Sequence, residues 1–281
     1  MKPLDNPPDR PDRRRAFTLV EVLVAVTVIA LILVLLLQVF VFTTSATRIA
    51  MQKMEGGDTA RVVFDSLNAD LMNLVSQQSL TVFAKSSGLN SELVLVTMSR
   101  GSQTGTRCMS VGYKLSSEGA LMRYTKPILW NNSALVTQAL TVEDASNPTL
   151  LAGGILRFQA VAVLDDGSLV PLAPNPMWND ALVDGQAVAD SFFALNLSDT
   201  TTGRKRVRSL IVGLVALDAQ GYHILESTRT LAKITTLFAA PEANQVPLDL
   251  WETPLSNGTL NGFPKPAVAV LQAFQHTYSL K

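Results

Sequence analysis

The chain has 281 residues, with 23 basic and 23 acidic side chains, so its formal net charge at pH 7 is zero. A balanced charge creates no overall field that would attract nucleic acid or acidic substrates. The single cysteine, Cys108, excludes an internal disulfide, and we expect its side chain to be a buried apolar group. The length suffices for one membrane helix and either one sizeable soluble domain or two small ones.

A long apolar segment follows a basic region near the N-terminus. Residues 1–16 are rich in proline, aspartate and arginine, and we expect them to be a disordered leader. Three arginines at positions 13–15 precede an apolar run that reaches Phe42, and no charged residue occurs in 22–47. About 20 helical residues cross a bilayer, so residues 17–43 are predicted to be a transmembrane helix with a cytoplasmic N-terminus.

One carboxylate, Glu21, stands inside this apolar segment. An acidic side chain costs about 2.5–3.5 kcal/mol at the centre of a bilayer and less near its surface. Intramembrane carboxylates usually have a partner for this reason. An ordinary membrane anchor explains the arginines and the apolar run, but it leaves Glu21 unexplained.

The residues Ala16-Phe17-Thr18-Leu19-Val20-Glu21, between a basic leader and an apolar helix, resemble the prepilin cleavage and methylation signature of type IV pilins and type II secretion pseudopilins. The resemblance implies that a membrane aspartyl peptidase cuts between Ala16 and Phe17 and then methylates the new amino group of Phe17. It also implies that Glu21 directs assembly. The family usually has glycine where this chain has Ala16.

The new amino group would stand four residues from Glu21 and could pair with it inside one chain or between neighbouring chains. Pairing between chains would let the cost of a carboxylate in lipid favour assembly. A secretory signal peptide is one alternative, but its apolar region is shorter, about 7–15 residues, and the nearest small-residue site here is Thr44-Ser45-Ala46. An uncleaved single-pass anchor is the second alternative, and it again leaves Glu21 unexplained.

The helix is expected to continue beyond the bilayer. Apolar residues then recur at steps of three and four, which indicates an amphipathic helix with one buried face. They are Val63, Phe64, Leu67, Leu71, Leu74 and Val75. We therefore predict a helix over about 17–78, with 44–78 as its amphipathic part and Gly56-Gly57 as its weakest point, since each helical glycine costs about 1 kcal/mol relative to alanine.

From about residue 79 the apolar period changes to two, which predicts strands. The strands are expected at 80–84, 93–98, 108–115, 121–124, 155–163 and 207–217, with a short one at 135–142. Hairpin turns are predicted at 116–119 and 165–167. The hairpin over 111–124, with Tyr113-Lys-Leu followed by Leu121-Met-Arg, resembles one in the minor pseudopilin called J.

The remaining segments are predicted as follows. Residues 126–150, 171–180 and 200–203 are loops, 181–195 holds a short helix, and 222–225 returns as a strand beside 207–217. The pattern over 225–237 fits helix and strand equally. Residues 241–266 are an extended loop, and 266–280 closes with a short helix, since proline suits a helix start.

These elements predict an α+β fold. A long N-terminal helical spine, transmembrane in its first half, packs on an antiparallel β-sheet domain. The expected organisation is a leader (1–16), an assembly helix (17–43), its amphipathic continuation (44–78), a periplasmic β-rich domain (79–240) and a C-terminal tail (241–281).

The sequence carries no recognisable catalytic or cofactor motif. His223 and His276 lack metal-ligand spacing to Cys108, and no glycine-rich phosphate loop occurs. Asp165-Asp166 with Asp180 or Asp184 is a calcium alternative, but the spacing matches no calcium loop and a solvated turn explains it better. We therefore expect a non-enzyme without cofactors.

Two further groups of residues are candidate interaction surfaces. The basic cluster Arg204, Lys205, Arg206 and Arg208 beside a glycine loop could contact DNA, lipid headgroups or an acidic partner, although such clusters are usually solvated. Three tryptophans, Trp130, Trp178 and Trp251, are predicted in loops, where each either anchors an interface or pins its own loop to the core.

The resemblance implies a structural subunit of a type IV pilus-like filament or a secretion pseudopilus, held in the inner membrane with its domain in the periplasm. The large size favours a minor, tip-type subunit, similar to pseudopilin J or to prepilin-like proteins of a cassette family of the Verrucomicrobia. Expected partners are a prepilin peptidase, other pilin subunits and membrane lipid, whereas nucleic acid is not expected. The alternatives are a pilin-anchored adhesin or DNA-binding tip protein, an enzyme anchored by a pilin-like helix, and an uncleaved single-pass protein.

Overall fold

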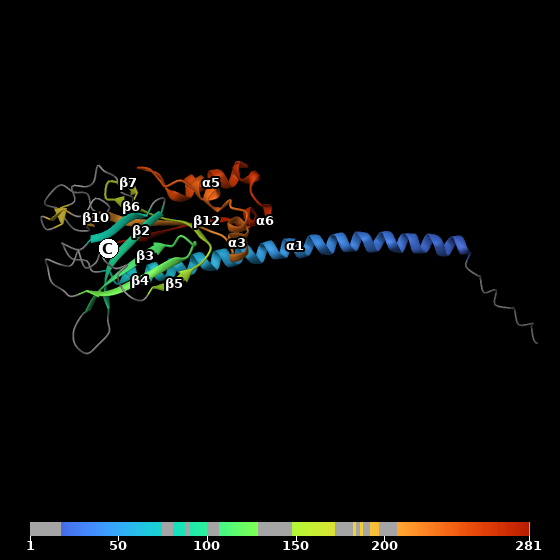
Figure 1. Cartoon of the computed structure of the whole chain (residues 1–281), viewed down its shortest axis with the longest axis horizontal. Coiled ribbons are helices and arrows are strands. Elements are labelled where there is room, and N and C mark those ends of the chain that lie inside the picture. The colour runs from blue at the N-terminus through green and yellow to red at the C-terminus, as the bar shows by residue number, and fades with distance from the viewer. Residues whose placement is uncertain are drawn as a thin grey trace, which may run out of the picture. The chain divides into compact units, whose positions relative to one another are not determined.

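The computed structural model describes residues 18–74, 81–87, 90–99, 107–128, 148–171, 182–183, 186–187, 192–196 and 207–280. Its first element is helix α1 (Leu19–Met72), which Figure 1 shows as the longest element of the chain. The expected helix is confirmed over these residues, and Gly56-Gly57 does not interrupt it. The expected end near residue 78 was wrong, because α1 ends at Met72 and Leu74 forms a bridge with Thr97. The chain forms two compact units, Met1–Arg48 and Ile49–Lys281, and all remaining elements belong to the second.

The C-terminal end of α1 tightens into a final turn. The Asn73 and Leu74 amides donate to the Asp70 and Leu71 carbonyls at 3.1 and 3.2 Å. The Asn73 side-chain amide also donates to the Ala69 carbonyl at 2.7 Å, which satisfies one terminal acceptor of the helix. The Asn73 carbonyl accepts a hydrogen bond from the Met98 amide at 2.8 Å, so the helix end is tied to the first sheet.

The first sheet has six antiparallel strands in the order β10-β1-β2-β3-β4-β5. Their bounds are β1 (Thr81–Ser87), β2 (Asn90–Ser99), β3 (Arg107–Leu115), β4 (Leu121–Ile128), β5 (Thr149–Ala152) and β10 (Phe192–Asn196). The predicted hairpin is confirmed, because the Ser116 amide donates to the Ala120 carbonyl at 2.8 Å across the turn. Gly119 supplies the positive φ of 70° that this turn requires.

The second sheet has the order β12-β11-β6-β7, also antiparallel. Its strands are β6 (Ile155–Leu164), β7 (Leu169–Pro171), β11 (Val207–Ala216) and β12 (Gln272–Ser279). A turn at 165–167 joins β6 to β7 as predicted, with Gly167 at φ 84°. Two short strands, β8 (Leu182–Val183) and β9 (Gln186–Ala187), pair with each other.

Helices follow β11, and here several expectations were wrong. They are α3 (Ala219–Ser227), α4 (Leu231–Leu237), α5 (Pro247–Ser256), the 3₁₀ helix η3 (Thr259–Gly262) and α6 (Lys265–Val268). The expected strand at 222–225 is part of α3, which begins where the Asp218 side chain accepts a hydrogen bond from the Gly221 amide at 2.9 Å. The segment 225–237, for which helix and strand fitted equally, is helical apart from a short break.

The C-terminal region is not the expected loop and tail. Proline lies in the first turn of both α5 and α6, within the segment predicted as loop, in agreement with the preference of proline for the first helical turn. Beyond the four-residue α6, the chain forms β12 rather than a longer helix, because β11 offers it a complete antiparallel edge from Ser209 to Ala216. In 181–195, the described residues are strands rather than the expected helix. The strand expected at 135–142 lies outside the described residues.

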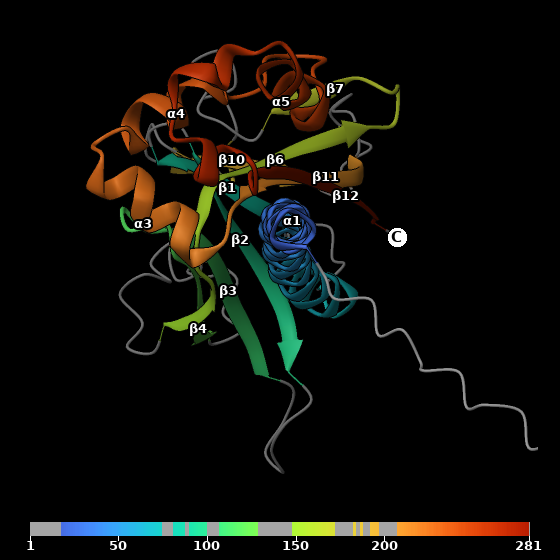
Figure 2. The same ribbon diagram turned by 90° about the vertical axis from the view of Figure 1, so that its right-hand side faces the viewer.

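The core has two parts, one on each face of the second sheet. On one face, Val63 and Leu67 of α1 pack with Phe158 and with residues of the first sheet. On the other face, the helices after β11 bury Trp251 and Phe238. Figure 2 shows α4 and α5 above the second sheet and the part of α1 after Ile49 below it. The predicted α+β fold, with a helix on antiparallel sheets, is confirmed.

The two sheets and the helical layer are joined by buried polar contacts. Ser91 at the start of β2 donates to the Gln159 side chain of β6 at 2.7 Å. Arg157 of β6, fully buried, donates through Nη2 to the Thr235 carbonyl in the last turn of α4 at 2.8 Å. Burial lowers the pKa of Arg157 to about 10, because the apolar surroundings disfavour its charge.

Candidate functional site

Glu21 lies in the first turn of α1. Of the residues predicted for processing and assembly, it is the one that the structure describes. The Thr18 side-chain oxygen accepts a hydrogen bond from the Glu21 amide at 3.2 Å, and the Thr18 carbonyl accepts from the Val22 amide at 3.2 Å. Thr18 therefore caps the helix. Ala16 and Phe17, the predicted cleavage site, lie outside the described residues.

Because of this cap, the Glu21 carboxylate also stabilises the first turn of α1. A carboxylate in the first turn of a helix interacts favourably with the helix dipole, whose positive end is at the N-terminus. The spacing Thr18-x-x-Glu21 is that of a capping box, in which a hydroxyl residue and an acidic residue three positions later both serve the first turn. Sequence reasoning missed Thr18, although this spacing was the available signal.

The first part of α1 presents apolar side chains on every side. From Leu19 to Phe42, the large apolar residues are between 48% and 81% exposed. Within the described residues, α1 is the one helix long and apolar enough to cross a membrane. A helix that is apolar all round is covered by lipid or by other protein in its working state.

The polar residues of this segment suit such surroundings. Thr27 donates its hydroxyl to the Val24 carbonyl at 2.8 Å. Thr43 and Thr44 donate to the carbonyls four residues earlier, also at 2.8 Å. The hydroxyl protons are thus satisfied inside the helix, which lowers the cost of placing them in a medium without water.

The later part of α1 is held to the first sheet by a buried network around Asp70. Arg123 of β4 donates from Nε and Nη2 to the two Asp70 carboxylate oxygens at 2.8 and 2.7 Å, and the Tyr113 hydroxyl of β3 donates to the same carboxylate. Burial, followed by the nearby Asp70 charge, raises the pKa of Tyr113, and the hydrogen bonds to Asp70 raise the pKa of Arg123. Tyr113 and Arg123 both belong to the predicted hairpin, whereas Asp70 gave no sequence signal.

Two more hydrogen bonds fix this part of α1 to elements far along the chain. Gln52 donates to the Asp218 carboxylate at 2.7 Å, next to the start of α3. The Tyr278 hydroxyl of β12 donates to the Phe64 carbonyl at 2.9 Å, and burial raises the pKa of Tyr278. The helix is therefore bonded to both sheets and to the helical layer.

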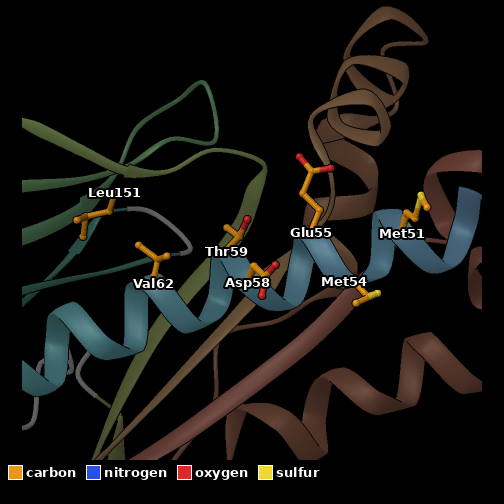
Figure 3. Close-up of a pocket in the computed structure, with 7 residues that line it drawn as sticks. All are labelled: Met51, Met54, Glu55, Asp58, Thr59, Val62 and Leu151. Atoms are coloured by element: carbon orange, nitrogen blue, oxygen red, sulfur yellow. The ribbon is translucent and has the colours of Figure 1, made fainter.

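An open groove of about 500 Å³ runs along the outer face of α1. It is lined by Met51, Met54, Glu55, Asp58, Thr59 and Val62 from α1 and by Leu151 from β5. Figure 3 shows Leu151 beside the helix, at the end of the groove where Val62 lies. The spacing of three and four between the α1 residues places them on one face of the helix. We call these seven residues the acidic groove.

The other candidate residues are dispersed. His223 is exposed on α3 and His276 is exposed on β12, rather than in a terminal tail. Cys108 is buried, as expected, and burial raises its pKa. No group of three metal-ligating side chains occurs among the described residues, and Asp166 accepts hydrogen bonds from the Ser168 amide and hydroxyl at 3.0 and 2.6 Å within its turn. Asp180 and Asp184 lie outside the described residues.

The two predicted interaction surfaces have different outcomes. Of the basic cluster, Arg208 is exposed on β11, while residues 204–206 lie outside the described residues. Trp251 is fully buried in α5 and donates its indole N–H to the Ala239 carbonyl at 2.9 Å, so it pins the helical layer to the core. Trp130 and Trp178 also lie outside the described residues.

Comparison with known proteins identifies the N-terminal region. Residues 11–37 match the model of the prokaryotic N-terminal methylation motif. No curated protein matches the chain. Among solved structures, a type IV-like pilin from Thermus thermophilus is similar, with 11% sequence identity and a TM-score of 0.37, covering 79% of this chain and 93% of that chain. The chain thus carries the prokaryotic N-terminal methylation motif over residues 11–37.

Proposed function

We propose that the chain is a structural subunit of a type IV pilus-like filament or a type II secretion pseudopilus. The observation that carries this proposal is the methylation motif at 11–37, which opens a helix with exposed apolar side chains on all its faces. Such a surface is covered by lipid before assembly and by neighbouring helices after it. A subunit that leaves the membrane and joins a filament through these helices has its apolar surface covered in both states.

In this proposal a prepilin peptidase cuts between Ala16 and Phe17 and methylates the new amino group. The Thr18 cap then holds Glu21 within the first turn of α1, four residues along the chain from the new N-terminal residue. The positive amine of a neighbouring subunit would be attracted to the Glu21 carboxylate more strongly in lipid than in water. Glu21 is thereby the residue that favours assembly over storage in the membrane.

The subunit is proposed to be a minor, non-enzymatic one with its domain in the periplasm. After removal of the leader, 265 residues remain, which is large for the major subunit of a filament shaft. The hairpin of β3 and β4, which resembles that of pseudopilin J, supports the same assignment. Its Tyr113 and Arg123 bind Asp70 and so connect the sheet with the helix.

The test of processing is the mass of the N-terminal peptide from membranes of cells that contain the prepilin peptidase. A peptide that begins at N-methylated Phe17 is the expected result. A chain that retains residues 1–16 in those cells would refute processing, and the protein would then be an uncleaved membrane-anchored domain.

The test of assembly is Glu21→Ala, with Glu21→Gln as a matched variant that keeps the shape of the side chain. Both variants should be cleaved normally and should lose most incorporation into filaments, because neither retains the charge that attracts the amino group. Incorporation is measured by immunoblotting of sheared filaments. Normal incorporation of Glu21→Gln would show that the charge plays no part in assembly.

A further inference from the structure

The acidic groove exposes apolar side chains on the unit that begins at Ile49. Three of them are strongly exposed, namely Met51 at 65%, Met54 at 70% and Val62 at 52%. Exposed apolar side chains gathered beside a hollow are typical of interaction sites. Methionine in particular adapts its shape to a partner, because its side chain is unbranched and flexible.

The negative charge of the acidic groove indicates that its partner surface is basic. Glu55 and Asp58 are exposed in the groove, none of the seven lining residues is basic, and within the described residues neither carboxylate has a hydrogen-bond or ion-pair partner. By contrast, the neighbouring Asp65 pairs with Arg61 at 3.7 Å. A surface with apolar side chains and two free carboxylates is complementary to one that carries basic side chains with long apolar stems.

The same chain carries such a surface where α3 meets α4. Arg229 and Lys233 are exposed, stand four residues apart, and have no ion-pair or hydrogen-bond partner for their side chains within the described residues. Arg229 also has a φ of 54°, a backbone conformation that glycine or asparagine adopts at lower cost. This conformation ends α3, where the Arg229 and Thr230 amides donate to the Glu226 and Leu225 carbonyls, both at 2.9 Å.

Figure 2 shows α4 and the part of α1 after Ile49 on different sides of the second sheet. The groove and the basic surface therefore belong to different elements and share no residue. A contact between two different surfaces of identical chains is heterologous, so it joins copies head to tail rather than in a symmetric pair. We propose that the acidic groove receives the surface around Arg229 and Lys233 of a second copy of this chain. This inference rests on the proposed function, since it names one contact between the domains of neighbouring subunits.

The first test is disulfide cross-linking of the full chain in membranes of cells that contain the peptidase and the filament machinery. A variant with both Asp58→Cys and Lys233→Cys should give a ladder of multimers, because each chain then carries both halves of the contact. Either single change should give monomers, and a mixture of the two single variants should give dimers only. Dimers from Asp58→Cys alone would mean that two grooves face each other, which would overturn the proposal.

An assembly reporter separates this inference from the proposed function. The reporter is incorporation of the variant with both Asp58→Cys and Lys233→Cys into sheared filaments, measured by immunoblotting under reducing conditions. If this variant is incorporated and gives no cross-link between positions 58 and 233, the groove contact is wrong while the filament proposal stands. If neither this variant nor the unchanged chain is incorporated, both are wrong.

Charge reversal tests the complementarity itself. Replacing Glu55 and Asp58 by lysine should reduce incorporation about tenfold, because two attractive charge pairs become repulsive. Adding Arg229→Glu and Lys233→Glu should restore incorporation, and failure of this fourfold variant to recover would overturn the choice of partner surface.

The matched control for charge reversal is Asp249→Lys with Glu252→Lys on α5. Both residues are exposed, and the change in net charge equals that of the groove variant. Incorporation of this control should stay normal. An equal loss in the control would mean that net charge, rather than the groove, governs incorporation, and the proposal would fail.

Discussion

At the level of single residues, the buried polar contact around Asp70 determines how firmly α1 is held to the first sheet. The Asp70 carboxylate is buried and accepts hydrogen bonds from Arg123 and Tyr113. Removing one partner of a buried pair leaves the other charge in apolar surroundings without compensation. The loss of either Asp70 or Arg123 should therefore lower the free energy of unfolding of the domain.

We expect Arg123→Met to lower the free energy of unfolding by about 2–4 kcal/mol, somewhat less than for a fully buried pair because the Arg123 side chain is 26% exposed. Urea unfolding of the detergent-solubilised chain measures this change. Arg61→Met is the matched control, because its ion pair with Asp65 is exposed and should contribute less than about 0.5 kcal/mol. Equal effects of the two substitutions would contradict the buried network.

The two buried tyrosines predict a loss of stability in alkali. Burial raises the pKa of Tyr113 and Tyr278 in the folded chain above the ordinary value of about 10. Above pH 10 the unfolded chain therefore binds fewer protons than the folded chain, so the free energy of unfolding falls as the pH rises. Below about pH 10 this contribution is fully present. Unfolding by urea between about pH 8 and pH 11 tests the prediction, and Tyr278→Phe should reduce the alkaline slope.

At the level of elements, two glycines should respond to alanine in opposite ways. A Cβ atom at Gly57 of α1 would meet no atom within 4 Å, whereas one at Gly213 of β11 would lie 2.7 Å from Pro247 and 2.9 Å from Trp251. Gly57→Ala should raise the free energy of unfolding by about 0.5–1 kcal/mol through helix propensity. Gly213→Ala should lower it by about 1–3 kcal/mol, because α5 must move away from the sheet. Thermal unfolding of both variants measures the two effects, and destabilisation by Gly57→Ala would contradict an uncrowded helix at that position.

At the level of the whole molecule, the C-terminal residues belong to the core. Strand β12 pairs with β11 from Ser209 to Ala216, and Trp251 fills the space under the helical layer. Truncation after Ala240 should therefore expose both and prevent the domain from folding, which protease digestion of membranes would show as rapid degradation. The control is removal of Lys281 alone, which leaves β12 complete. A protease-resistant domain that ends at Ala240 would mean that the C-terminal residues are a dispensable tail after all.

Local sequence pattern was sufficient for the features that involve only neighbouring residues. The run without charged residues over 22–47 predicted a helix in apolar surroundings. Apolar residues at every second position predicted the strands β3, β6 and β11. Glycine residues predicted the turns at 116–119 and 165–167. Glu21 was identifiable because a lone carboxylate is costly in such a run. Helical and strand periods are properties of the backbone, so they can be recognised before any packing is known.

Packing of the folded chain was needed to show which distant segments meet. Residues 272–279 become a strand because β11 leaves one edge open for them, and local pattern did not reveal that edge. Asp70 finds Arg123 and Tyr113 only after α1 packs across the hairpin. The acidic groove likewise forms only because Leu151 arrives from β5. Contacts between residues far apart in sequence depend on the packing of the whole chain, so no single stretch of sequence contains them.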